Sequence, residues 1–329
     1  MKFQLLPFLP LVHGLEHWLY SSQVADALHL LDRPDIVGVQ ALYSWKALET
    51  TEGAYNFSVI KNDLATVASK GKKLWVQLQD RTFNAANDPV PPYLHSPYYN
   101  NGSAPTCDGE HCDTNFEVSG WMAQQWNPRV RRRFQALLSA MAANLDGRVY
   151  GINLAETSIS VDAHANNYTD AAYFYGELEN AGHAASAFNA SYVVQYVNFW
   201  PDGWANANNR FNTSFDYYAS HGVGVGGPDL IPFQRGQETN SYPFIAAYRD
   251  KVPISVVAVQ EPDLTKINPH TGKPFTKDEF VDYANGLGVR IIFWATAAPW
   301  AAFTISHVEE QMSQSPHKDK QQNDEKCNA

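Results

Sequence analysis

The 329-residue sequence has few basic residues, and this scarcity excludes several classes of partner. Lys and Arg together number 24 against 34 Asp and Glu, which gives a formal net charge of −10. Nucleic acids and anionic membrane surfaces are bound through a basic face, which this composition does not supply. No apolar run approaches the roughly 18 residues that a membrane-spanning helix needs. We therefore expect neither a nucleic-acid partner nor a membrane span.

Cysteine is also scarce, with three residues in the chain. Cys107 and Cys112 bracket a short loop, whereas Cys327 lies in a polar tail. We expect a disulfide between Cys107 and Cys112, which would imply an oxidising and therefore secreted or extracytoplasmic location. The alternative is a zinc site that uses Cys107, His111 and Cys112, but it lacks an evident fourth ligand. Mild support for secretion comes from five Asn-x-Ser/Thr sequons, which begin at Asn56, Asn101, Asn167, Asn189 and Asn212.

Hydrophobic residues make up 44% of the chain, enough for a sizeable core. Short apolar runs alternate with polar loops and helix-compatible stretches, as expected for βα units around a parallel sheet. Eight such runs predict a single closed (β/α)₈ barrel, the TIM-barrel fold. The predicted strands are Gln4–Val12, Ile36–Leu42, Lys73–Leu78, Val149–Leu154, Tyr192–Phe199, Gly222–Val225, Ile254–Val259 and Val289–Phe293. The barrel would occupy residues 1–305, and the polar residues 306–329 are predicted to be a disordered tail.

The first apolar run has two interpretations. It begins with one Lys and continues as an apolar stretch, as a short signal peptide does. However, it contains two prolines and lacks a small-x-small cleavage site before His13. We assign Gln4–Val12 to the first strand, because without it only seven predicted strands would remain.

Three stretches carry helix signals: 63–71, Pro128–Leu145 and Lys277–Leu287. The connection between the third strand and the third helix, roughly Thr82 to Trp126, is unusually long for a compact domain. Long structured loops on the carboxyl side of a barrel usually shape the substrate cleft, and we expect this one to do so.

Barrel enzymes place their catalytic groups at the carboxyl ends of the strands. The predicted strands here end in carboxylates, amides and tryptophans, with few basic residues. Glu156 and Glu261 each follow a buried apolar strand, and the two strands face each other across the predicted barrel mouth. Two carboxyl groups about 5–5.5 Å apart are what a retaining glycosidase needs, one as nucleophile and one as acid/base. The other strand-end candidates are His13, Trp45, Asp80, Arg81, Asn198, Trp200, Asp229 and Trp294.

The second strand continues into Tyr43-Ser44-Trp45-Lys46-Ala47-Leu48-Glu49, followed by Glu52-Gly53-Ala54-Tyr55-Asn56-Phe57. This pattern resembles the strand-two signature of clan A glycoside hydrolases, and the resemblance extends over roughly residues 37–300. It implies an acid/base Glu after strand four and a nucleophilic Glu after strand seven, positions that fall on Glu156 and Glu261. It further implies that Trp294 floors the first sugar subsite, and that the reaction on a carbohydrate substrate needs neither a metal nor an organic cofactor.

One position departs from that clan. The clan carries Asn directly before its acid/base Glu, where it contacts the sugar 2-hydroxyl, whereas this chain has Ala155. Asn153, nearby, and Asn198, at the end of strand five, are candidates to supply the amide. Three further residues have candidate roles with structural alternatives. Arg81 could hold the nucleophile ionised or simply pair with Asp80. Asp229 could face a ligand or cap a helix, and His13 could bind a sugar hydroxyl or bridge backbone groups. Trp45, Trp200, Trp204 and Trp300 are candidates for stacking on sugar rings or for packing in the core.

Two other functions remain open from the sequence. A non-catalytic barrel that binds glycans would also explain the many aromatic residues, nine of them Trp, together with the missing Asn. A metal-dependent hydrolase is the weaker alternative. His13-Gly14-Leu15-Glu16-His17 matches the His-x-x-Glu-His zinc-protease pattern, but that pattern must lie in a helix, and this segment contains a glycine.

Overall fold

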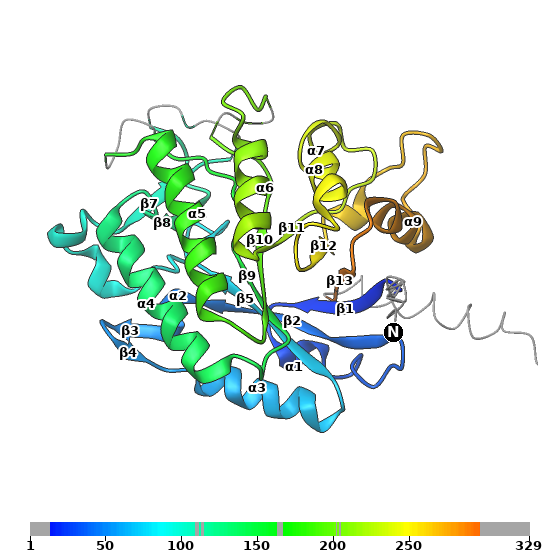
Figure 1. Cartoon of the computed structure of the whole chain (residues 1–329), viewed down its shortest axis with the longest axis horizontal. Helices are drawn as coiled ribbons and strands as arrows, with labels where there is room; N and C mark the ends of the chain where they lie inside the picture. The colour runs from blue at the N-terminus through cyan, green and yellow to red at the C-terminus, as the bar shows by residue number, and fades with distance from the viewer. Residues whose placement is uncertain are drawn as a thin grey trace, which may run out of the picture.

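The computed structural model describes residues 14–108, 112, 115–162, 167–201, 203 and 205–296. Eight parallel strands form a closed barrel with the order β1-β13-β12-β11-β10-β9-β5-β2 (Figure 1), so strands adjacent in the chain are neighbours in the sheet. The barrel strands are β1 (Glu16–Ser21), β2 (Ile36–Ser44), β5 (Lys73–Gln79), β9 (Gly151–Leu154), β10 (Tyr192–Tyr196), β11 (Gly224–Gly227), β12 (Ser255–Val259) and β13 (Ile291–Ala295). The prediction of a (β/α)₈ barrel is confirmed.

The first barrel strand differs from the prediction. It is Glu16–Ser21 rather than Gln4–Val12, and it closes the barrel by pairing with β13 on one side and β2 on the other. In this segment Trp18 belongs to the barrel interior and Leu19 to the layer beneath the helices, the alternation that a strand requires. The strand count is complete without Gln4–Val12, so the counting argument for that segment fails. Gln4–Val12, His13 and the tail 306–329 lie outside the described residues.

Aromatic side chains fill the interior of the barrel. Trp18, Trp75 and Phe293 contact one another at ring-centroid distances of 5.4–6.1 Å, and all three are fully buried. Glycines make room for these rings, because a Cβ at Gly151 would stand 2.7 Å from the Trp75 ring. The interior is therefore a packed core rather than a channel, as in other barrels of this kind.

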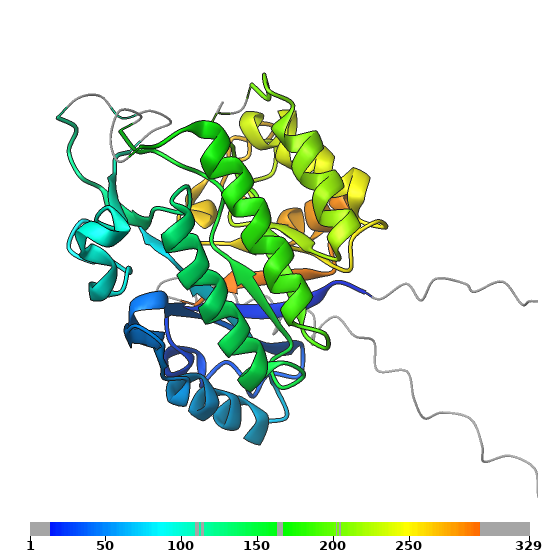
Figure 2. The ribbon, with the colours of Figure 1, turned by 60° about the vertical axis from the view of Figure 1, so that its left-hand side comes forward.

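Helices cover the outside of the barrel. In Figures 1 and 2, α4, α5 and α6 lie side by side along one flank, while α3 lies near β2 and β5. The helices are α1 (Val24–Ala27), α2 (Trp45–Leu48), α3 (Ser58–Ser69), α4 (Pro128–Leu145), α5 (Asp170–Ala187), α6 (Arg210–His221), α7 (Arg235–Thr239), α8 (Ser241–Tyr248) and α9 (Lys277–Leu287). All three predicted helices are present, and α9 begins with a capping box between Thr276 and Glu279. Within the part of the chain that the structure describes, no helix combines the length and apolarity needed to cross a bilayer.

The long connection between β5 and α4 has its own structure. Three short strands, β6 (Arg81–Thr82), β7 (Ser103–Thr106) and β8 (Gly120–Ala123), form an antiparallel sheet in the order β6-β8-β7. Two 3-10 turns, Pro92–His95 and Pro97–Tyr99, precede β7. Elsewhere, β3 (Glu49–Thr51) and β4 (Ala54–Tyr55) form a hairpin, and Asp263–Thr265 is a 3-10 turn after β12.

Cys107 and Cys112 form the predicted disulfide, with their Cα atoms 5.7 Å apart. Both sulfurs are therefore committed to each other, which removes the alternative of a zinc site at these cysteines.

The glycine at the start of β2 provides a test of the barrel core. A Cβ on Gly38 would stand 2.1 Å from the Lys73 carbonyl oxygen and 2.6 Å from the Trp18 ring. Because neither the paired strand nor the enclosed ring can retreat, Gly38→Ala should lower the free energy of unfolding by about 1–3 kcal/mol or more. Gly286→Ala in α9 is the matched control: its Cβ meets nothing within 4 Å, so it should leave stability unchanged or raise it by up to about 1 kcal/mol. Urea denaturation of both variants would measure the difference, and equal stability of the two would contradict the packing argument.

Candidate active site

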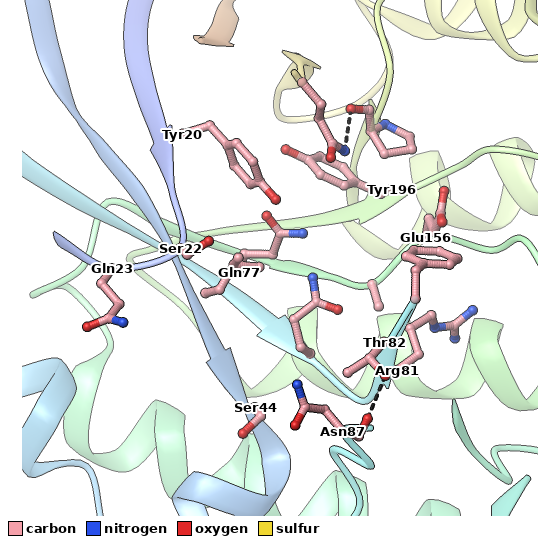
Figure 3. Close-up of a pocket in the computed structure, with 16 residues that line it drawn as sticks. Tyr20, Ser22, Gln23, Ser44, Gln77, Arg81, Thr82, Asn87, Glu156 and Tyr196 are labelled. Atoms are coloured by element: carbon pink, nitrogen blue, oxygen red, sulfur yellow. Dashed lines mark hydrogen bonds between the residues drawn. The ribbon is translucent and has the colours of Figure 1, made fainter. Parts of the chain in front are cut away.

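A cavity of about 640 Å³ opens at the carboxyl ends of the barrel strands, the rim where barrel enzymes carry out their chemistry. Figure 3 shows the side chains of several strands converging on it. Residues at the strand ends supply most of its wall: Tyr20, Ser22, Gln23, Leu42, Ser44, Gln77, Gln79, Ala155, Glu156, Tyr196, Pro228 and Gln260. The long β5–α4 connection supplies the rest, Arg81, Thr82, Phe83 and Asn87, and so shapes the cavity as expected.

Glu156 lies two residues after the last residue of β9 and is partly exposed in the cavity wall. The side-chain amide of Asn198 donates a hydrogen bond of 2.9 Å to its Oε2 atom. Asn198 is itself held in place, because its backbone N–H donates to the Thr157 hydroxyl at 3.1 Å, and that hydroxyl donates to the Phe199 carbonyl. The segments after β9 and β10 are therefore joined around Glu156, and one carboxylate oxygen has a fixed donor.

The floor of the cavity is a network of buried amides. The Gln40 amide donates to Asn153 Oδ1 at 2.9 Å and to the Tyr196 hydroxyl at 2.8 Å. The Trp75 indole donates to the same Asn153 oxygen at 3.0 Å. Asn153 is fully buried, so it supports the floor from inside the barrel and does not line the cavity. The predicted contact between Asn153 and a sugar is therefore not supported by its position.

Gln77 and Tyr20 stand above this floor. Gln77 is 5% exposed and lines the cavity, and its Oε1 atom has no hydrogen-bond partner within the described part of the chain. Figure 3 shows Gln77 between Tyr20 and Glu156. A buried, unpaired amide oxygen is costly unless a ligand or water satisfies it. Gln77 is thus placed to accept a hydrogen bond from a bound hydroxyl group.

Carboxylates that follow three different strands lie close enough to the Tyr20 hydroxyl to affect its pKa. Burial raises the pKa of Tyr20, and the negative charges of Glu261, Asp229 and Glu156 raise it further. Charge interactions weaken with distance, so one hydroxyl that senses all three carboxylates indicates that they lie around the same mouth. Glu156 and Glu261, distant in sequence, therefore act on one point in space.

Glu261 nevertheless lies at the edge of this arrangement. Val256 and Ala258 of β12 point into the barrel interior, and Gln260 continues that alternation into the cavity wall. Glu261 is the next residue, partly exposed, and is not part of the cavity lining. At the end of β12, the side chain that faces the cavity is thus the amide of Gln260. The carboxylate expected as nucleophile, Glu261, is one residue further on.

Two aspartates lie beside the glutamates. Burial and the charge of Glu156 raise the pKa of Asp229 to about 7, and Lys266 partly offsets this increase. Burial and the charge of Asp229 raise the pKa of Asp263 to about 9. Asp263 is 1% exposed and accepts a hydrogen bond from the Gln260 backbone N–H at 2.8 Å. Both carboxyl groups are therefore protonated more readily near neutral pH than an exposed aspartate would be.

Arg81 pairs with the protein rather than with a nucleophile. Its guanidinium donates to Asp80 Oδ1 at 3.2 Å and to Glu177 Oε1 at 2.9 Å. The same group donates to the Ser158 carbonyl at 2.8 Å and to the Tyr173 hydroxyl at 3.1 Å. The alternative of a salt bridge to Asp80 is therefore correct, and Glu177 is a second partner that the sequence did not indicate. Asp80 is fixed in turn by a 2.7 Å hydrogen bond from the Gln125 amide.

The tryptophans proposed to stack on sugars are buried between the barrel and its helices. Trp45 and Trp200 are fully buried, and their indoles donate to Glu49 and Ser214. Trp294 is 1% exposed and donates to His17 Nδ1 at 3.1 Å. None of these three rings lines the cavity, so the stacking roles predicted for them are corrected. Trp204, Trp300 and His13 lie outside the described residues.

The described part of the zinc-protease pattern is not helical, as its glycine led us to expect. Glu16 and His17 lie in β1, where consecutive side chains point to opposite faces, rather than in a helix. His17 stacks on Trp294 with ring centroids 6.1 Å apart. Burial and the charge of Lys277 lower its pKa to about 4, so it is a neutral residue of the outer core.

Sequence reasoning missed Tyr20, Gln77, Gln260 and Phe83 of the cavity wall. Tyr20 was missed because the first strand was assigned too early in the chain. A usable signal existed for the glutamines, because Gln40 and Gln77 interrupt otherwise apolar barrel strands. A polar residue within a buried strand calls for a hydrogen-bond partner or a ligand.

No family model matches the sequence, and a sequence search of curated proteins finds no match. Solved structures do match in fold at low identity. A β-galactosidase from the psychrophilic Marinomonas ef1 is 10% identical, with a TM-score of 0.54 over 85% of this chain and 54% of that one. A family 39 glycoside hydrolase from the gut symbiont Bacteroides cellulosilyticus WH2 is 10% identical, with a TM-score of 0.51 over 86% of this chain and 56% of that one. This chain thus spans about half of the length of these two proteins.

A structure described as a glycoside hydrolase matches over similar lengths of both chains. It is 10% identical, with a TM-score of 0.52 over 88% of this chain and 89% of that one. At such identity the similarity shows a shared barrel fold. The structures that match are described as glycoside hydrolases, and the feature that this chain shares with them is the barrel fold.

The buried ion network around Arg81 predicts how stability changes with pH. Burial raises the pKa of Glu177 to about 7 from 4.5, against the opposing charge of Arg81. Between these two pH values the folded protein binds more protons at this site than the unfolded chain, so this contribution to stability is present below pH 4.5 and is lost as the pH rises to 7. Glu177→Gln removes the titration, and its melting temperature should fall less than that of the wild type from pH 5 to pH 8. Glu179→Gln, on the exposed side of the same helix, controls for loss of a negative charge. Parallel pH dependence in wild type and Glu177→Gln would contradict this assignment.

Proposed function

We propose that this protein is a glycoside hydrolase in which Glu156 is the proton donor. The observation that carries the proposal is the setting of Glu156. It is a carboxyl group at the carboxyl end of a barrel strand, in the wall of a cavity of about 640 Å³, with a fixed amide donor at 2.9 Å. The shared fold with glycoside hydrolases supports the same conclusion, although fold by itself does not establish activity.

The cavity chemistry favours a neutral carbohydrate as substrate. Its wall presents amides, hydroxyls and tyrosines, which are groups that hydrogen-bond sugar hydroxyls. Arg81 is the one basic side chain in the described lining, and its guanidinium is already bound to Asp80 and Glu177. No free cation in that lining is available for an anionic sugar, so a neutral glycan fits better than a uronic acid or a phosphorylated sugar.

The proposed reaction is a retaining double displacement with Glu261 as nucleophile. A carboxylate oxygen of Glu261 attacks the anomeric carbon while the bond to the leaving oxygen breaks, and Glu156 transfers its proton to that oxygen. Glu156, now ionised, takes a proton from water, and the hydroxide oxygen replaces Glu261 at the anomeric carbon. The shared influence of both glutamates on Tyr20 supports this pairing. Every step uses carboxyl groups of the chain and water, without a metal or organic cofactor.

Asp229 is the competing candidate for the second carboxyl group. The charge of Glu156 contributes to its raised pKa, so the two carboxyl groups are electrostatic neighbours. If Asp229 rather than Glu261 were essential, the role of nucleophile or base would move to β11.

The disulfide and the proposed substrate together favour an extracytoplasmic location, where disulfides persist and polymeric glycans are found.

Glu156→Gln tests the proton donor. This variant retains the hydrogen-bonding shape but cannot protonate the leaving oxygen, so kcat on an unactivated glycan should fall by about 10²- to 10⁴-fold. On a dinitrophenyl glycoside, whose leaving group needs no proton, the loss should be far smaller. Initial rates on both substrates give the comparison, with Glu179→Gln as a control. Undiminished hydrolysis of the unactivated glycan by Glu156→Gln would refute the role.

Glu261→Ala and Asp229→Asn separate the two candidates for the second carboxyl group. Removal of the nucleophile should abolish turnover, and added azide should restore it as a glycosyl azide of inverted configuration. We expect this rescue for Glu261→Ala and not for Asp229→Asn, with the products followed by NMR. The reverse result would transfer the role to Asp229. Binding of glycans by the wild type without any turnover would instead favour the non-catalytic alternative.

A further inference from the structure

A second cavity, of about 280 Å³, lies next to the first at the barrel mouth. The two cavities share four lining residues: Arg81, Thr82, Phe83 and Glu156. Arg81 is held by its buried ion pairs, and the Thr82 hydroxyl donates to the Asn87 carbonyl at 2.7 Å. The other two groups at the junction, Glu156 and Phe83, are therefore the candidates for ligand contact. The proposed proton donor therefore stands where one cavity meets the other.

Two loops that are tied together supply part of the wall of the smaller cavity. Cys107 and Asp108, at the start of the disulfide loop, form one side. Ser158 and Ser160, in the segment that follows Glu156, form another. The Cys107 backbone N–H donates to the Ser160 carbonyl at 3.1 Å, which joins the two sides. The disulfide thus fixes a wall of this cavity a few residues from the proposed proton donor.

Phe83 lies at the junction with its ring open to solvent. Its exposed fraction of 73% exceeds that of the other exposed large hydrophobic side chains in the described chain, among which Tyr98 at 59% and Tyr175 at 58% come next. Single exposed apolar residues are ordinary on protein surfaces. Phe83, however, contributes to two cavities and to the wall beside Glu156. An aromatic face there offers a surface for the apolar C–H face of a sugar ring.

We propose that the smaller cavity is a binding site for the leaving-group sugar, and that Phe83 is the platform on which the glycan stacks as it crosses the junction. This inference rests on the proposed function. A proton donor must reach the oxygen between two sugar units, and Glu156 is common to both cavities. One sugar then occupies the larger cavity and the next occupies the smaller one. The substrate is thus a neutral oligosaccharide or polysaccharide, bound on both sides of the bond that is broken, rather than a simple glycoside.

The test compares substrates that differ in what occupies the smaller cavity. Neutral tetrasaccharides of glucose, mannose, xylose and galactose fill both cavities, whereas the glycosyl fluoride of the same sugar places only fluoride on the leaving-group side. Phe83→Ala should lower kcat/KM on the hydrolysed tetrasaccharide at least tenfold more than on its fluoride. Phe83→Tyr should restore the tetrasaccharide rate, because it restores the ring. Tyr175→Ala, which removes an aromatic ring of similar exposure on α5, should change neither rate.

Equal losses on the two substrates, or no loss on either, would overturn the inference while leaving the proposed function intact. Hydrolysis of neither substrate by the wild type would instead count against the proposed function. In that case calorimetric titration of the same tetrasaccharides into wild type and Phe83→Ala decides the binding role: weaker binding by the variant supports it, and equal affinity or no binding to the wild type overturns it. Because Phe83 is largely exposed, the variant should melt at the wild-type temperature, which checks that the effect is local.

Discussion

The pairing of β1 with β13 closes the sheet, and the candidate site depends on this closure. In the register of that pair, Tyr20 of β1 lies beside Ala295 near the carboxyl end of β13. Because all eight strands are parallel, closure brings every carboxyl end to the same rim. Tyr20, Glu156 and Glu261 come from parts of the chain that have no local reason to meet. The ring of strands brings them to one mouth, where the carboxylates that follow β9, β11 and β12 all raise the pKa of a single tyrosine hydroxyl.

A second constraint operates behind the rim. A buried guanidinium must have its donors satisfied, and Arg81 achieves this with two carboxylates, a hydroxyl and a backbone carbonyl. These partners lie directly after β5, on α5 and in the segment that follows Glu156, so the network connects the loops that form the cavity wall. Burial disfavours the charged form of Glu177 and raises its pKa, and the negative charge of Asp80 adds to this increase although Arg81 opposes it. The same residue that looked like a ligand contact in the sequence therefore organises the loops.

The sequence was sufficient for the fold and for the position of Glu156, but not for the orientation of side chains. Seven of the eight strands follow from apolar runs bounded by turns. The first strand was misplaced because an apolar run nearer the N-terminus also brought the number of predicted strands to eight. Trp45, Trp200 and Trp294 follow or end strands as ligand-binding residues do, yet their rings turn outward under the helices. Position along a strand does not determine which face a side chain takes once the strand has ended. Gln260 and Glu261 show this most clearly, because Gln260 lines the cavity and Glu261, the next residue, does not.

The buried amide network below the cavity and the loops above it differ in how readily they tolerate substitution. Gln40, Asn153 and Tyr196 hold one another across the barrel, and Trp75 anchors them from below. Replacing any one of these residues would leave hydrogen-bonding groups of the others without a partner. A single substitution there would therefore rarely be tolerated. The side chains of Phe83 and Asn87, in the loop above, are not part of this network. New substrate preferences in this lineage would therefore arise by exchange of rim residues over an inherited base, and the same asymmetry indicates where directed evolution of this barrel should begin.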